Sequence, residues 1–441
     1  MLSLFIVSLI STLQVKSDRI VTSSRPVGQT NLRQFESGKT FRCPGRSLCT
    51  LGLFALVAFI FNSEVTKDPL ALSPVVGKRI STPTGTLISC DLKALKDTVD
   101  IPLSYLTEEL QIVKLDNRDE ALIGGWVRTT VSDNYILVSN KKQTPYKLFT
   151  RDGKFVTTIG AYGEGPNEYA NTYAEQLDEA HDRIYILPWQ SNKLLVFDLK
   201  GNPQPSIPLC LRVPKGQFKV DTKKSEVTVT TLPFQGTPAV VWIQDFEGKR
   251  KNFIPALHLM VPRDFSNEVF MDKNTSDYSV MLMTIVPSPR VDSLYHYNSQ
   301  QNRLETRFTV SYPNKEEIPW HGYTEYPRHF VGDVSVPVQV SANTWSGSRP
   351  AKYIVDKQTL HGNYFRLYND FLGTKKMQIW PSFANGYYIN NMEPAQLKET
   401  LEKELARKDL PNDVRKRIQT LVKSLDEGGN NVVLFAKMKD K

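Results

Sequence analysis

The chain has 441 residues, 40% of them hydrophobic, and its aromatic share of 10% with 27 prolines is typical of a folded protein with many strands and turns. Its net charge of +9 would indicate a nucleic-acid-binding protein only if the basic residues clustered on the folded part. Residues 1–46 hold seven basic and two acidic residues, which gives +5 and leaves +4 for the other 395 residues. This distribution argues against a nucleic-acid-binding protein.

Residues 1–62 are interpreted as a leader with a signal-like or anchor-like apolar segment. Leu51–Phe61 is an uncharged apolar run of 11 residues, and Arg42 and Arg46 precede it. This length suits a signal-peptide core and is short of the ~20 residues that a spanning helix needs. Basic residues ahead of the run hold that end in the cytoplasm and send the rest across the membrane. We therefore expect an exported protein of the periplasm or cell envelope, with Leu51–Phe61 as a candidate membrane anchor.

Two alternatives stay open for this apolar run. It is also compatible with a buried core helix, and a leader that is never processed would leave a cytoplasmic protein. The following residues, 63–104, mix proline, threonine, serine and lysine without periodicity. They are interpreted as a linker, so that the folded domain begins at residue 105.

The domain at 105–441 shows a repeat of strands and turns. Tyr135–Gly153 and Tyr185–Gly201 both open with Tyr-Ile-Leu, pass a polar turn, return through an apolar strand and end on glycine. Val240–Gly248 repeats the closing half, and the closing glycines are separated by 48 and 47 residues. Four strands in about 40 to 50 residues are typical of a propeller blade. Because 105–441 has room for six such units with insertions, we predict an all-β fold, a six-bladed β-propeller.

A cluster of glycines, Gly160, Gly163 and Gly165, follows the predicted strand Phe155–Ile159. A phosphate-binding loop should open into a helix whose N-terminus faces the anion, and residues 167–174 show no helical apolar spacing. The cluster is therefore predicted to turn the chain between two blades, since glycine adopts the positive φ angles of such turns.

Two helices are predicted near the C-terminus, over residues 394–408 and 412–426, because apolar residues recur there every third or fourth position. Together they form a helical hairpin insertion at 393–428 within the propeller. The apolar run 432–438 follows as a final strand. We expect it to close the ring by pairing within a blade begun near the other end of the domain.

The phrases DGKFVTTIG, GEGPNEY, DRIYIL and NKLLVFD, between residues 148 and 198, resemble NHL-type repeats. The chain is more closely similar to a bacterial family of exported six-bladed β-propellers of the cell envelope. That family's pattern of a C-terminal helical insertion and a last hydrophobic strand matches residues 393–439. The resemblance covers about 105–441, and it implies an envelope location without implying an activity.

No catalytic, metal-binding or cofactor-binding pattern is evident. The two cysteines of the folded part, Cys90 and Cys210, either pair in an oxidising compartment or stay free thiols. The histidines show neither metal-ligand spacing nor a regular interval; they are His181, His258, His296, His321, His329 and His361. We predict no metal and no cofactor. The alternative is a metal-dependent NHL-type propeller lyase or hydrolase.

The candidate binding residues are Tyr162, Trp189, Trp320 and Trp345, which lie in expected loops beside glycine, proline or polar residues. Aromatic rings at a propeller face stack on sugars or anchor a protein partner. Alternatively, each ring packs between blades, as large aromatic residues often do. We therefore expect a non-enzymatic binding or scaffold protein of the bacterial cell envelope, which binds a protein or a glycan at one propeller face.

Overall fold

The computed structural model describes residues 68–440, apart from 125–126, 141–143, 287–288, 290–291, 315–316 and 342–343. The chain divides into the units Met1–Thr66 and Lys67–Lys441, and the description concerns the second. The leader expected at 1–62, with its apolar run Leu51–Phe61, lies outside the described residues. Within the described ranges, no helix has the length and apolar character needed to cross a membrane.

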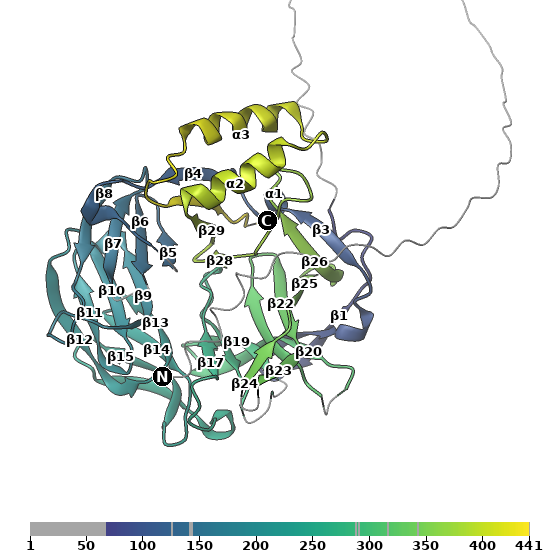
Figure 1. The fold of residues 1–441 in the computed structure, drawn as a ribbon. Helices are drawn as coiled ribbons and strands as arrows, with labels where there is room; N and C mark the ends of the chain where they lie inside the picture. Colours follow the sequence, from purple (N-terminus) through teal and green to yellow (C-terminus); the bar gives the residue numbers. More distant parts are fainter. Residues whose placement is uncertain are drawn as a thin grey trace, which may run out of the picture. The chain divides into compact units, whose positions relative to one another are not determined.

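The described residues form six blades around a central axis, each with four antiparallel strands in which the first lies nearest the axis (Figure 1). Blade 1 contains β5 (Val127–Val131), β6 (Tyr135–Asn140), β7 (Thr144–Thr150) and β8 (Phe155–Ile159). Blade 2 contains β9 (Thr172–Asp178), β10 (Arg183–Pro188), β11 (Ser191–Phe197) and β12 (Pro203–Val213). Blade 3 contains β13 (Gly216–Asp221), β14 (Glu226–Thr231), β15 (Ala239–Asp245) and β16 (Arg250–Pro255). The predicted all-β six-bladed propeller is confirmed.

Blades 4 and 5 come next in the chain. Blade 4 contains β17 (Glu268–Phe270), β18 (Ser279–Met283), β19 (Ser293–Asn298) and β20 (Arg303–Ser311). Blade 5 contains β21 (Trp320–Glu325), β22 (His329–Ser335), β25 (Ala351–Asp356) and β26 (Gly362–Tyr368), and the short β27 (Gln378–Ile379) pairs with β26. A separate hairpin of β23 (Pro337–Ser341) and β24 (Thr344–Gly347) stands between β22 and β25.

Blade 6 joins the two ends of the domain. Its strands are β28 (Phe383–Ala384), β29 (Tyr387–Met392), β30 (Val432–Lys437) and β4 (Gln111–Lys114), the last supplied from the N-terminal side. β30 pairs with β4 in antiparallel register, with Val433 opposite Val113. The expected closure of the ring by the final strand is confirmed, and it gives blade 6 its full set of four strands.

The assignment of residues 63–104 to a linker is corrected by the structure. β1 (Gly77–Thr82) and β2 (Gly85–Asp91) extend blade 4, where β2 pairs in parallel with β20. β3 (Thr98–Pro102) pairs in parallel with β26 of blade 5. β1 pairs locally with β2, but β2 and β3 join the blades through strands more than 200 residues away, so no local repeat in the sequence marks them.

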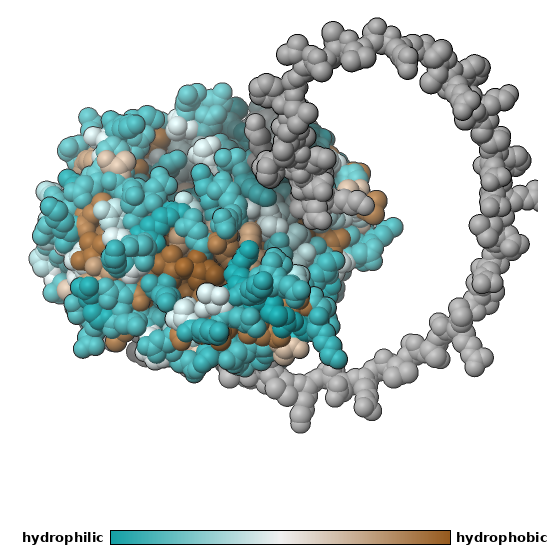
Figure 2. All heavy atoms as spheres, turned by 90° about the horizontal axis from the view of Figure 1, so that it is seen from above, coloured by the Kyte–Doolittle hydropathy of each residue, from teal (hydrophilic) through white to brown (hydrophobic). Residues whose placement is uncertain are grey.

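The predicted helical pair is present between β29 and β30. α2 (Pro394–Leu405) and α3 (Asn412–Ser424) bury Leu397, Leu401 and Ile418 against Leu434 of β30, and a one-turn helix, α1 (Leu103–Leu106), precedes β4. Pro394 begins α2, where its missing N–H costs no hydrogen bond. The side that includes this pair, uppermost in Figure 1, is mostly hydrophilic with one hydrophobic area near its middle (Figure 2).

The core consists of layers between neighbouring blades. Leu148 and Phe197 share the layer between blades 1 and 2, and Phe149 and Phe435 share the layer between blades 6 and 1. Each central strand is therefore covered on both faces, which explains continuous apolar runs such as those of β10 and β11.

The closing glycines of the repeat occupy equivalent turns between the third and fourth strands of blades 1 to 3. Gly153, Gly201 and Gly248 have φ angles of 92°, 86° and 85°. A Cβ on Gly153 would lie 2.2 Å from the Lys114 carbonyl of β4, so this turn packs on the preceding blade. The repeat is confirmed, and its Tyr-Ile-Leu openings lie in β6 and β10, the second strands of blades 1 and 2, so each repeat in the sequence begins within a blade.

Candidate functional site

The two edges of the propeller differ in their loops. The links from the second to the third strand of a blade, and from the fourth strand to the next blade, leave the blades at one edge, which we call the connection face. The links from the first to the second and from the third to the fourth strand leave at the opposite edge, which we call the turn face. This follows from the antiparallel order of the strands and holds for every blade.

All four predicted aromatic residues lie at the connection face, in two groups. Tyr162, in the β8–β9 link, and Trp189, in the β10–β11 turn, are 46% and 45% exposed. Trp345, in β24, is 49% exposed. Trp320 begins β21, where it is half-buried, and a Cβ on Gly347 of the β23–β24 hairpin would lie 3.3 Å from its ring. The structure thus brings Trp320 and Trp345 to one hairpin, while Tyr162 and Trp189 belong to the links around blade 2.

More exposed hydrophobic residues share this face than the sequence analysis selected. Ten of the fifteen large hydrophobic side chains exposed in the described ranges lie in its links: Leu122, Tyr162, Trp189, Leu257, Met260, Val336, Val338, Val340, Trp345 and Trp380. The remaining five are Leu72, Val75, Val156, Phe253 and Phe270. One signal was available in the sequence, because the alternation Val336-Pro-Val338-Gln-Val340 is typical of a strand with one apolar face.

Trp380 belongs to a small polar and aromatic group at this face. The Lys352 Nζ lies 4.2 Å from the centroid of the Trp380 ring, a cation–π contact. The same Nζ donates to Asp333 Oδ2 at 3.5 Å. Lys352 therefore links an exposed aromatic ring to a carboxylate that lines the axial cavity described below.

Residues 271–278, the link between β17 and β18, form a loop that we call the crossing loop. The Asp272 Oδ2 accepts from the backbone N–H of Glu325 in blade 5 at 2.8 Å, and its carbonyl accepts from Asn385 in blade 6. Lys273 Nζ donates to the Glu175 carbonyl of blade 2 at 3.3 Å and lies 5.5 Å from the Phe218 ring of blade 3. One loop of blade 4 thus contacts four other blades, so it crosses the axis at the turn face.

A cavity of about 310 Å³ lies beside the axis, above the crossing loop. It extends along the first two strands of blades 4 and 5, from Met283 and Asp333 toward the connection face to Asp272 and Ser279 toward the turn face. The lining residues are Phe270, Met271, Asp272, Ser279, Met281, Met283, Leu294, Gly322, Tyr323, Thr324, Asp333 and Phe383. Such a volume, with mostly apolar walls and a few polar groups, is at the small end of ligand-binding sites in proteins.

Burial raises the pKa of the Asp272 carboxyl to about 6, although hydrogen bonds from the backbone N–H groups of Glu325 and Asn274 oppose the shift. The Glu325 side chain, in turn, is held ionised. Its own burial would raise its pKa, but His296 and Lys357 hold the pKa below its usual range. Lys273 shows the opposite effect, since burial lowers the pKa of its amine to about 8. The crossing loop therefore places one weakened acid and one weakened base beside the axis.

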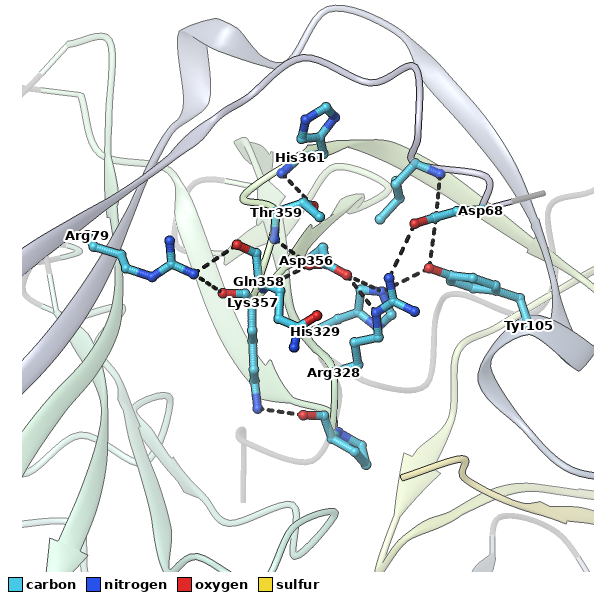
Figure 3. Close-up of polar contacts among 12 residues, drawn as sticks. Asp68, Arg79, Tyr105, Arg328, His329, Asp356, Lys357, Gln358, Thr359 and His361 are labelled. Carbon is cyan, nitrogen blue, oxygen red and sulfur yellow. Dashed lines mark hydrogen bonds and ion pairs between the residues drawn. The ribbon is translucent and has the colours of Figure 1, made fainter. Parts of the chain in front are cut away.

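A second polar group is found at the turns of blade 5 (Figure 3). Arg328 Nε donates to Asp356 at 2.8 Å, and its NH2 group lies 3.3 Å from Asp68. The Tyr105 hydroxyl donates to Asp68 and lies 3.4 Å from His329 Nε2. The adjoining cavity holds about 20 Å³, room for about one water molecule. These residues therefore fasten the segment at Asp68 to blade 5 rather than form a ligand site.

The remaining chemical predictions concern metals and thiols. Cys90 and Cys210 are free, and burial raises the pKa of the Cys90 thiol to about 12. In the described ranges, no group of three or more histidine, cysteine or acidic residues is placed to hold a metal ion. His296 contacts Glu325 through Nε2 at 2.5 Å and is thus part of the support below the cavity.

The comparisons with known proteins agree with the fold. The model of a family described as "Domain of unknown function (DUF4934)" matches residues 87–437, and no curated protein matches the sequence. A candidate exported protein from Bacteroides fragilis has a similar structure, with 14% identity and a TM-score of 0.52 over 78% of this chain and 99% of that chain. A member of the DUF4221 family from Bacteroides vulgatus has 11% identity and a TM-score of 0.39, covering 76% of this chain and 98% of that chain. The similarity to the first structure supports the fold and nothing beyond it, and the TM-score of the second is too low to support a conclusion. The NHL-type assignment stays a prediction.

Proposed function

Because this chain belongs to the family described as "Domain of unknown function (DUF4934)", its function has to be inferred from its surface, and we propose a non-enzymatic binding protein that docks a protein partner on its connection face. The observation that carries the proposal is the concentration of ten exposed large hydrophobic side chains in the links of this one face. Exposed apolar side chains gathered on one part of a surface mark sites of interaction.

The composition of the face favours a protein over a glycan. Aromatic rings alone suit both partners, because rings stack on sugars and also anchor protein interfaces. Leu257, Met260, Val336, Val338 and Val340 are aliphatic, and such side chains are buried favourably against apolar protein surface. The β23–β24 hairpin adds a two-stranded sheet whose outer edges pair with no other strand in the described ranges, which suits strand addition by a partner.

An envelope location is part of the proposal. It is supported by the basic residues and apolar run of the leader, with Leu51–Phe61 as the proposed membrane anchor, and by the description of one similar structure as a candidate exported protein. The alternative is a metal-dependent lyase or hydrolase. In the ranges that the structure describes, no group of metal-ligating side chains supports it.

Site-specific photo-crosslinking in the native host tests the docking face. A photoreactive phenylalanine analogue replaces Trp189 or Trp345 at the connection face and, as a matched control, the exposed Lys223 in a β13–β14 turn of the turn face. We expect a discrete protein adduct from the first two positions and none from Lys223. Adducts only from Lys223, or adducts to polysaccharide rather than protein, would contradict the proposal, and fractionation of the same cells checks the envelope location.

A further inference from the structure

The axial cavity has a charge and surface that define a ligand class independent of partner docking. We propose that it binds a small organic amine, with the ammonium group at Asp272 and an apolar body along the first two strands of blades 4 and 5. Two of the twelve lining residues carry carboxylic acids, Asp272 and Asp333, and none is lysine, arginine or histidine. The cavity therefore favours a cation over an anion.

The nearest basic side chains have partners of their own. Lys352 donates to Asp333 and stacks on Trp380, and Lys357 donates to Glu325. Lys273 turns away toward the Glu175 carbonyl and the Phe218 ring. Asp272 itself contacts backbone N–H groups and the Ser279 hydroxyl but no cation. A ligand ammonium would thus be the first positive charge at this carboxylate.

The carboxylate of Asp272 can accept a further hydrogen bond. Its Oδ1 accepts from the Asn274 N–H at 3.1 Å and from the Ser279 hydroxyl at 3.4 Å. Its Oδ2 accepts from the Glu325 N–H alone among the described residues, at 2.8 Å. Because a carboxylate oxygen has two lone pairs, Oδ2 retains one for a ligand N–H. Such a charge-assisted bond is stronger than one between neutral groups.

The rest of the lining suits the apolar body of the ligand. Phe270, Tyr323 and Phe383 contribute aromatic rings, whose faces attract cations. Met281 and Met283 contribute polarizable thioethers that adapt to the shape of an apolar group. The volume of about 310 Å³ limits the ligand to a small molecule.

The binding should depend on pH through Asp272. The charged groups that face it are Glu325 with its partners His296 and Lys357, the neighbouring Lys273, and Asp333 with Lys352 across the cavity. Of the two carboxylates in the lining, Asp272 titrates near pH 6, because burial raises its pKa. Since only the ionised form attracts an ammonium group, affinity falls as pH drops below about 6, by about tenfold per unit.

Calorimetric titration of the full chain with three isosteric probes tests the ligand class. 2-Phenylethylamine, 2-phenylethanol and phenylacetate share a ring and differ in charge. At pH 7.5 we expect the amine to bind about tenfold or more tightly than the alcohol, and phenylacetate not to bind. At pH 5 the affinity for the amine should be about tenfold lower, because most of Asp272 is then protonated.

Variants complete the test. Asp272→Asn should weaken amine binding by about tenfold or more, whereas Asp133→Asn, at an exposed carboxylate in the corresponding β5–β6 turn of blade 1, should leave it unchanged. Gly322→Leu should abolish binding, because a Cβ there has ordinary contacts of 3.6 Å or more with Asp333 and the side chain then fills the cavity. The Gly322→Leu variant blocks the cavity without changing Asp272, so the proposal can still be tested if Asp272→Asn fails to fold. Equal binding of amine and alcohol, tighter binding of phenylacetate, or an unchanged affinity in Gly322→Leu would overturn the proposal.

Discussion

The connection face and the turn face are built from the same six blades, yet the chemical character of their side chains differs. At the turn face, aspartate side chains accept hydrogen bonds from backbone N–H groups of the turns. Asp198 accepts from the N–H groups of Lys200 and Asn202, and Asp356 accepts from those of Gln358 and Thr359. At the connection face, apolar side chains such as Trp345 and Val340 are exposed instead. The difference teaches that the turn face satisfies its backbone within the chain, whereas the connection face leaves apolar side chains exposed, as the proposed docking requires.

The largest effect that tests this comparison is expected at a turn-face carboxylate. Asp356 is fully buried and bonded to Arg328 and to two backbone N–H groups. Asp356→Ala leaves the two backbone N–H donors without an acceptor and Arg328 with Asp68 as its remaining carboxylate partner, so the free energy of unfolding should fall by about 3–5 kcal/mol in urea denaturation. The control is Asp333→Ala in the same blade, where the carboxylate is 38% exposed and contacts Lys352; it should cost less than about 1 kcal/mol. Equal losses would refute the assignment of stability to the turn face.

The next effect concerns pH and a buried histidine of the same face. Burial lowers the pKa of His329 to about 4, so between pH 6.5 and 4 the unfolded chain binds a proton that the folded chain does not. Stability from this residue is therefore present above pH 6.5 and lost as pH falls toward 4, by about 3 kcal/mol. Measured as unfolding free energy against pH, His329→Gln should flatten the curve across this window. His258→Gln, at an exposed residue of the connection face, should leave the slope as it is.

A third prediction shows that parts of the connection face are also fixed. Gly160, in the β8–β9 link, has φ of 68°, and a Cβ there would lie 2.7 Å from the ring of Tyr169. That ring is buried, and its hydroxyl is held by the Tyr146 N–H and the Ile159 carbonyl. Gly236 has a similar φ of 87° with open space around its Cβ. Thermal or urea unfolding should therefore show Gly160→Ala to be less stable than Gly236→Ala by about 2 kcal/mol, the cost of overpacking. Similar losses in both variants would mean that Tyr169 moves aside.

The sequence sufficed for the parts of the fold whose causes are local. The spacing of Gly153, Gly201 and Gly248 marks equivalent turns because each needs a positive φ and close contact with the preceding blade. The helical pair was predictable from apolar spacing because α2 and α3 each bury one face on blade 6. In contrast, β2 and β3 pair with strands far along the chain, and their composition resembles that of a linker.

The candidate sites were predictable to a smaller extent. Aromatic residues beside turn-forming residues are visible in a sequence, so the exposure of Tyr162 and Trp345 was predictable, whereas the aliphatic members of the connection face have no such signature. The axial cavity was missed because its walls meet only in three dimensions. Asp272 has a raised pKa because the crossing loop carries it onto the axis, and nothing in its neighbouring sequence reveals the four blades that the loop contacts.

The smallest expected effect on stability is at Trp345, and it best separates a role in partner docking from a role in folding. Trp345 is half exposed on the β23–β24 hairpin, so Trp345→Ala should change the free energy of unfolding by less than about 0.5 kcal/mol. The same change at Trp242, which is fully buried between blades 2 and 3, should cost about 3–5 kcal/mol. If Trp345 instead serves docking, its variant should lose the partner adduct formed from the Trp189 position, although its urea midpoint is unchanged. A large loss of stability in Trp345→Ala would mean that the hairpin is held against the blades, and the connection face would then be a second structural edge.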